Sequence, residues 1–218
     1  MNARDHGKPG RIAGPVLAML AGFAIAGCGD DPAGPGRGGD TTRPPTGLII
    51  LVPDAGAPPL ATSDTSFVAT KGVRSEVLLR YAPVPPDDTG DQFLELRIED
   101  QSLLRYPIGH PRAGALFVDG DTVTISISID PATLSATLLP SGLQFDPLNP
   151  AELELRYQNA DPDFDGDGDD DPDLEDDIDL WRQENPGDPW ERVGTLQDFS
   201  LDRVRADLTE FSRYALGI

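Results

Sequence analysis

Cysteine and histidine are nearly absent from this sequence of 218 residues, which contains one cysteine and two histidines. A single cysteine cannot form an internal disulfide, and a multi-histidine zinc site cannot be built. A serine–histidine–aspartate triad would depend on His110, and the chain has no G-x-S-x-G motif. A catalytic pair of carboxylates, as in glycoside hydrolases, stays open as an alternative. Acidic residues are so abundant, however, that their presence does not point to such a pair. We therefore expect a protein that is not an enzyme.

Positive charge is also scarce. Lys and Arg number 17 against 38 Asp and Glu, which gives a formal net charge of −21. Such a surface repels the phosphates of nucleic acids and anionic lipid headgroups. Nucleic acid is therefore not an expected partner, and cations or basic surfaces are.

No long window shows a helical period, whereas short apolar runs end repeatedly at Pro, Gly or Asp. The clearest alternation spans residues 122–130, where Val123, Ile125, Ile127 and Ile129 fall on one face. Together these patterns predict an all-β fold, an antiparallel β-sandwich. The other expected strands cover residues 48–52, 76–81, 93–98, 136–139, 151–157, 178–182, 191–195, 203–208 and 214–216.

The N-terminus has the layout of an export signal. Basic residues within 1–11 precede the uncharged stretch 12–27, which ends at Ile25-Ala26-Gly27-Cys28. This end resembles the bacterial lipobox, which implies a signal peptide over 1–27 and a lipid on Cys28. A membrane-spanning anchor is the alternative, but 16 residues rise only about 24 Å as a helix, short of a hydrocarbon core of roughly 30 Å. Ordinary secretion with Cys28 as a bystander also stays open.

A lipid on Cys28 would attach the chain to a membrane of the cell envelope and leave no free thiol. Residues 28–46 are rich in Gly, Pro, Asp and Thr and predict a flexible, disordered tether. Gly29 after the cysteine weakly favours the outer membrane over the inner one. The domain would then face either the periplasm or the cell surface.

The order of motifs in residues 93–218 resembles the ZU5-like β-sandwich modules of surface proteins. The strand over 122–130 is followed by Pro140-Ser141-Gly142-Leu143-Gln144-Phe145, a strand ending in Arg156-Tyr157, and a closing segment with Phe211-Ser212-Arg213-Tyr214. The resemblance implies one sandwich over 93–218, with residues 47–92 as an N-terminal β extension. Whether that extension shares the main core is left open.

The resemblance contains one departure. Some ZU5 proteins cut themselves at His-Phe-Ser, with the histidine as the base, whereas this chain has Glu210-Phe211-Ser212. A carboxylate with an ordinary pKa is a poor base near neutral pH. We expect no self-cleavage.

Residues 161–177 form the densest chemical pattern, with eleven acidic side chains among seventeen residues. Two registers, beginning at Asp161 and Asp163, match the D-x-D-x-D-G opening of calcium loops. The closing ligand is missing, because position twelve is Pro172 or Leu174, so the loop looks like a degenerate calcium loop. The candidate ligands are Asp161, Asp163, Asp165, Asp167, Asp169, Asp171, Asp173 and Glu175.

Two alternatives accompany these expectations. The acidic segment could be a solvated, mobile insertion without a metal. The aromatic residues Tyr157, Trp181, Trp190 and Tyr214 could form a stacking platform that binds carbohydrate, although such side chains more often pack in a core. The main expectation is a lipid-anchored structural or interaction module with an unidentified protein or glycan partner.

Overall fold

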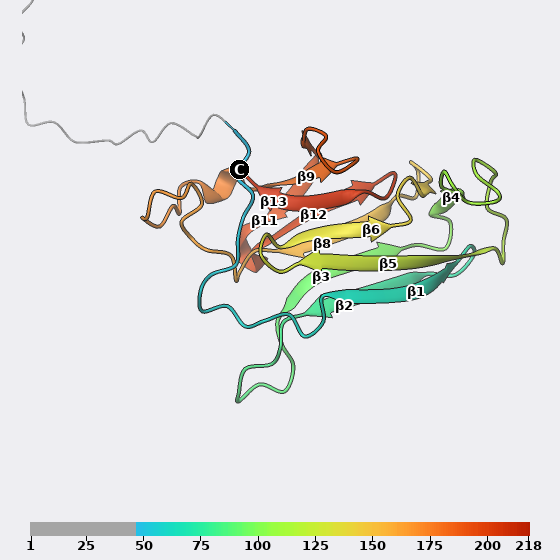
Figure 1. Cartoon of the computed structure of the whole chain (residues 1–218). Helices are drawn as coiled ribbons and strands as arrows, with labels where there is room; N and C mark the ends of the chain where they lie inside the picture. The colour runs from blue at the N-terminus through green and yellow to red at the C-terminus, as the bar shows by residue number, and fades with distance from the viewer. Residues whose placement is uncertain (1–46) are drawn as a thin grey trace, which may run out of the picture. The chain divides into compact units, whose positions relative to one another are not determined.

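Two antiparallel sheets packed face to face dominate the part of the chain that the structure describes (Figure 1). The computed structural model describes residues 47–218. One sheet has six strands in the order β1-β5-β6-β13-β9-β10, and the other has five in the order β11-β12-β8-β3-β2. A short pair, β4 and β7, stands apart from both. The expected all-β sandwich is confirmed.

The strand bounds are as follows. The six-stranded sheet contains β1 (Asp64–Thr70), β5 (Thr122–Asp130), β6 (Ser135–Leu139), β13 (Arg213–Gly217), β9 (Asp179–Gln183) and β10 (Glu191–Arg192). The five-stranded sheet contains β11 (Thr195–Asp198), β12 (Arg203–Leu208), β8 (Ala151–Arg156), β3 (Gln92–Ile98) and β2 (Ser75–Arg80). The remaining elements are β4 (Leu103–Arg105), β7 (Gln144–Phe145) and the 3₁₀ turns η1 (Glu175–Asp177) and η2 (Phe199–Leu201).

The core lies between the two sheets. Strand β5 buries Val123, Ile125, Ile127 and Ile129 and turns its hydroxyl residues outward, as the alternation predicts. Strands β3 and β8 supply leucines from the opposite sheet, including Leu94 and Leu153. Burial of these side chains on both inner faces is what holds the sheets together.

Residues 47–92 contribute to both large sheets. Strand β1 pairs with β5 in the six-stranded sheet, and β2 pairs with β3 in the five-stranded one. The turn between β1 and β2 therefore carries the chain from one sheet to the other. This settles the question of a shared core, because Leu79 and Tyr81 are fully buried in it.

The expectation of a strand over Leu48–Val52 is wrong, and the strand β1 was not expected. Only Ile50 forms a bridge, to Gly217, although Ile49 exchanges backbone hydrogen bonds with Ile218 and Leu51 N donates to the Leu216 carbonyl at 2.9 Å. The apolar run covers the last residues of β13, and the segment then changes partner, with Pro53 forming a bridge to Ala160. The short strands β4 and β7 were also not expected.

Two of the segments on which the sequence resemblance depends, residues 140–145 and 211–214, lie against each other. Gly142 N donates to the Phe211 carbonyl, and Phe211 N donates to the Leu143 carbonyl. Phe145 and Phe211 pack edge to face with ring centroids 4.8 Å apart. The link after β6 and the segment before β13 therefore form one closing unit of the sandwich.

Within residues 47–218, the structure contains no helix with the length and apolar character needed to cross a bilayer.

Gly217 is where the N-terminal segment crosses β13, and we predict that Gly217→Ala destabilises the fold. A Cβ atom there would lie 2.5 Å from the Ile49 carbonyl oxygen and 2.7 Å from Leu48 Cδ1. The backbone must shift to relieve this overlap, at a cost of about 1–3 kcal/mol in the free energy of unfolding, measured by urea denaturation. Gly194→Ala is the control, because a Cβ there meets nothing within 4 Å. Equal stability of the two variants would contradict the prediction.

Candidate metal centre

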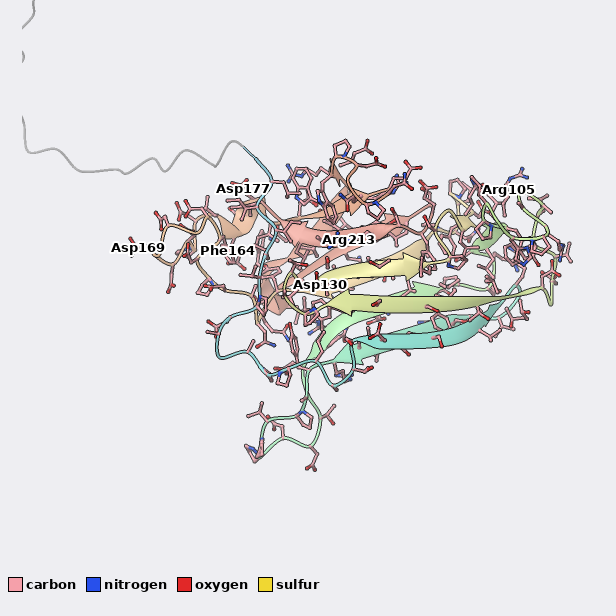
Figure 2. All side chains as sticks on the ribbon, in the orientation of Figure 1. Arg105, Asp130, Phe164, Asp169, Asp177 and Arg213 are labelled. Carbon is pink, nitrogen blue, oxygen red and sulfur yellow. The ribbon has the colours of Figure 1, made fainter. Side chains whose placement is uncertain are left out.

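The acidic segment connects β8 of one sheet to β9 of the other. Figure 2 shows it projecting beyond the strand ends, with Asp169 far out and Phe164 closer to the sandwich. Two apolar side chains anchor it, since Phe164 and Leu174 are buried in the core cluster. Asp161 N also donates to the Val52 carbonyl at 2.9 Å. The segment is therefore attached at several points rather than being a free loop.

Aspartate side chains shape the backbone of the loop. Asp163 accepts hydrogen bonds from Gly166 N and Gly168 N, at 2.8 and 2.9 Å. Asp165 and Asp167 each accept from the amide two residues later, at 3.0 Å. Both glycines have positive φ angles, 81° and 101°, which glycine adopts at little cost. The D-x-D-x-D-G-D-G spacing thus folds the chain into successive tight turns.

Three carboxylates converge in this loop. Asp163, Asp165 and Asp171 each place a carboxylate oxygen within 4.8 Å of the others. The chain turns back to make this possible: Asp171 N donates to the Pro162 carbonyl at 2.9 Å, and Asp165 N donates to Asp171 Oδ2 at 3.0 Å. In the register that begins at Asp163, these residues occupy positions one, three and nine. Hard cations such as Ca²⁺ bind to oxygen sets of this kind.

The other candidate ligands lie outside this cluster. Asp161 accepts a hydrogen bond from Asp163 N, and the Glu175 carboxylate accepts one from the Tyr157 hydroxyl at 2.8 Å. Three more are exposed and do not belong to it, namely Asp167, Asp169 and Asp173. The structure therefore brings together three of the eight residues expected from spacing.

The cluster concentrates negative charge that no basic side chain of residues 47–218 pairs with. Within residues 47–218, no salt bridge involves any residue of the segment 161–177. Asp171 is only 8% exposed. Partial burial, followed by the charges of Asp167, Asp171 and Asp163, raises the pKa of Asp165 above its ordinary value. The ionised form of Asp165 is therefore disfavoured in the folded chain.

A cation at the cluster would relieve this repulsion. Three carboxylates can supply a part of the six to eight oxygen ligands that Ca²⁺ takes, with backbone carbonyls and water supplying the rest. The absence of His and Cys from the cluster disfavours zinc and other softer metals.

Of the four aromatic residues considered for a carbohydrate platform, the two tyrosines are buried and the two tryptophans are half-buried. Tyr157 and Tyr214 are buried, and their hydroxyls bind to Glu175 and to the Glu210 carbonyl. Trp181 Nε1 donates to the Gly217 carbonyl, and the Arg213 guanidinium lies 5.4 Å from the Trp190 ring centre. These contacts are structural.

The structure also shows the surroundings of Glu210, Ser212 and His110, which the sequence analysis considered for catalysis. Ser212 is buried and donates a hydrogen bond to the Gln183 carbonyl, while the Glu210 carboxylate pairs with Arg182. His110 stacks on Tyr106 with ring centroids 4.3 Å apart. Cys28, the expected lipidation site, lies outside the described residues.

No protein-family model matches this sequence, and no curated protein or solved structure matches it.

We predict that Asp165→Asn raises the melting temperature of the metal-free protein at pH 7. A raised carboxylate pKa means that the folded state favours the neutral form, so stability is present at low pH and is lost as the pH rises through that pKa. Asparagine removes this loss and keeps the oxygen that accepts from Asp167 N. Thermal unfolding in EDTA from pH 3 to pH 7 measures the effect, which should shrink as the pH falls.

Asp176→Asn is the matched control, because it removes the same charge from an exposed position of the segment. An equal gain for both variants would show that only the total charge matters, and would contradict the prediction.

Proposed function

We propose that this protein is an exported, lipid-anchored, non-catalytic β-sandwich module of the cell envelope that calcium stabilises through its acidic loop. The sandwich would act as a ZU5-like structural or interaction domain at the end of a flexible tether. The order of the motifs along the chain and the mutual packing of the closing segments support the ZU5-like relationship.

The observation that carries the calcium proposal is the uncompensated cluster of Asp163, Asp165 and Asp171. Eleven acidic residues share a segment with which no arginine or lysine of residues 47–218 forms a salt bridge. Holding these charges close together costs free energy unless a cation is bound. The aspartate turns already define the backbone, so little further ordering is needed for binding.

The position of the loop gives calcium a structural role. Strand β8 belongs to the five-stranded sheet and β9 to the six-stranded one, so the loop is a connection between the two layers. Phe164 and Leu174 fix it to the core on either side of the outermost turns. A bound ion would therefore stabilise one end of the sandwich. With three clustered carboxylates and no closing bidentate glutamate, we expect extracellular-type affinity, with Kd about 10⁻⁴ to 10⁻³ M.

Calcium titration of the unlipidated chain from Cys28 onward, carrying Cys28→Ser, tests the proposal. We expect the melting temperature to rise and to saturate at millimolar calcium, because binding to the folded state alone stabilises it. Asp171→Asn should abolish the saturable rise, and Asp176→Asn should retain it.

Magnesium at equal concentration separates a specific site from general screening, since Mg²⁺ prefers a tighter and more hydrated coordination shell. A rise that is the same with both ions and in both variants would contradict a calcium site at the cluster.

Cys28→Ser in the full chain tests the anchor separately. We expect the wild-type chain to partition with membranes and to incorporate a labelled fatty acid, and the variant to lose both properties because it lacks the thiol that receives the lipid. Membrane pellets and metabolic labelling in the same bacterial host measure this. Full labelling of the serine variant would overturn the lipobox assignment, whatever the result for calcium.

A further inference from the structure

The outer edge of β1 differs from the other edges of the two large sheets. Strand β10 has only two residues, both charged, and β11 has four. Strand β2 carries Glu76 and Arg80 and a register shift, and its end is covered where Ala61 N donates to the Arg80 carbonyl. These are common protections of a sheet edge. The middle of strand β1, residues 65–69, has none of them.

Strand β1 is long and regular. Its sequence DTSFVAT contains no Pro, Gly, Lys or Arg, and all seven residues pair with β5 without a register shift. Figure 1 shows it as the outermost strand of its sheet. Its outward side chains include Val68, which is 59% exposed.

The direction of the backbone groups follows from the pairing with β5. Ile129 N donates to the Ser63 carbonyl, and Lys71 N donates to the Asp121 carbonyl, so the odd-numbered residues face β5. In an antiparallel ladder the alternate residues turn their N–H and C=O groups to the opposite side. Four residues of β1 therefore face outward, namely Asp64, Ser66, Val68 and Thr70.

In two of these residues, the outward backbone carbonyl already accepts a hydrogen bond. The Asp64 carbonyl accepts from the Thr62 hydroxyl, and the Thr70 carbonyl accepts from Val73 N. Ser66 and Val68 have no such partner among the residues that the structure describes. Their four backbone groups form a two-residue template for another strand.

We propose that β1 pairs with β1 of a second copy of this chain, antiparallel and centred on Phe67, to join the two six-stranded sheets. In this register Ser66 of each copy lies opposite Val68 of the other, and the pair exchanges both backbone hydrogen bonds. The same residues on both copies satisfy the hydrogen-bonding capacity of one another's backbone groups, as a two-fold interface requires.

Charge favours this arrangement over others. Asp64 is the only charged residue of β1, and in this register it lies opposite the uncharged Thr70. The two Asp64 carboxylates stand six residues apart along the strands, about 20 Å, which exceeds the screening length of about 8 Å. The chain enters β1 at the end of the sandwich that carries the acidic loop (Figure 1). Antiparallel pairing therefore puts the two acidic loops at opposite ends of the dimer.

Analytical ultracentrifugation of the unlipidated chain from Cys28 onward, with Cys28→Ser, tests the proposal. This chain contains every strand of the sandwich, since all the described elements lie within residues 47–218. We expect the average mass to rise toward twice that of the monomer as the concentration increases from micromolar to millimolar.

Two variants probe the edge. Val68→Pro removes the outward N–H but no bond to β5, and an edge strand tolerates proline in that orientation. Val68→Lys places a charge on the edge without changing the backbone. Each should raise the dimer dissociation constant by about tenfold or more, because symmetry applies the change twice.

Leu196→Lys on β11 is the matched control, since Leu196 is an equally exposed apolar residue, at 66%, on another edge strand. Melting temperatures in dilute solution establish that all three variants fold. A monomer at every concentration, or a dimer that both Val68 variants leave intact, or one that Leu196→Lys weakens equally, would overturn the proposal.

Discussion

Mutual repulsion between carboxylates is the constraint on which the rest of this structure depends. On the outer face of the five-stranded sheet, a network of arginines and acidic side chains offsets this repulsion. Arg97 lies within salt-bridge distance of Glu76, Glu95 and Glu152. Glu152 also pairs with Arg205, and Glu154 pairs with both Arg156 and Arg203. Single exposed pairs stabilise little, but a network on a rigid sheet prevents the repulsion that unpaired acids would cause. Four of the chain's few basic residues are used there: Arg97, Arg156, Arg203 and Arg205.

The loop between β8 and β9 receives none of this compensation. Phe164 and Leu174 tie it to the core, so it cannot relax its charges by moving freely into solvent, and Asp171 is drawn into a nearly buried position. Hydrogen bonds from loop amides stabilise the carboxylates in part. The remaining repulsion is what a bound cation would remove, and this links the stability of the fold to the proposed function of the site.

The fold was largely predictable from the sequence, and the site only in part. The bounds of β5 follow from strict alternation because one face is buried, whereas β1 has a weak signal, its inward residues being Thr65, Phe67 and Ala69. The run Leu48–Val52 looked like a strand because it is apolar, but pairing with β13 decides its form. The spacing of the aspartates located the acidic loop in the sequence, but it did not identify which of the eight candidate ligands lie together. The return of the chain that brings Asp171 to Asp163 depends on the Pro162 carbonyl and on anchoring in the core.

The same repulsion limits how two copies of the chain can approach each other. A parallel or side-by-side arrangement would align the acidic loops and bring their uncompensated charges together, with a cost that salt screens only beyond about 8 Å. An antiparallel pairing through β1 avoids this, since the strand itself carries one charge and the loops lie at opposite ends. If a lipid holds the chains on one surface, their local concentration rises, and a pair of short strands then suffices for association that would be weak in dilute solution. The charge distribution that supports the proposed cation site at one end of the sandwich thus also favours the antiparallel geometry for the proposed pairing of the β1 edge.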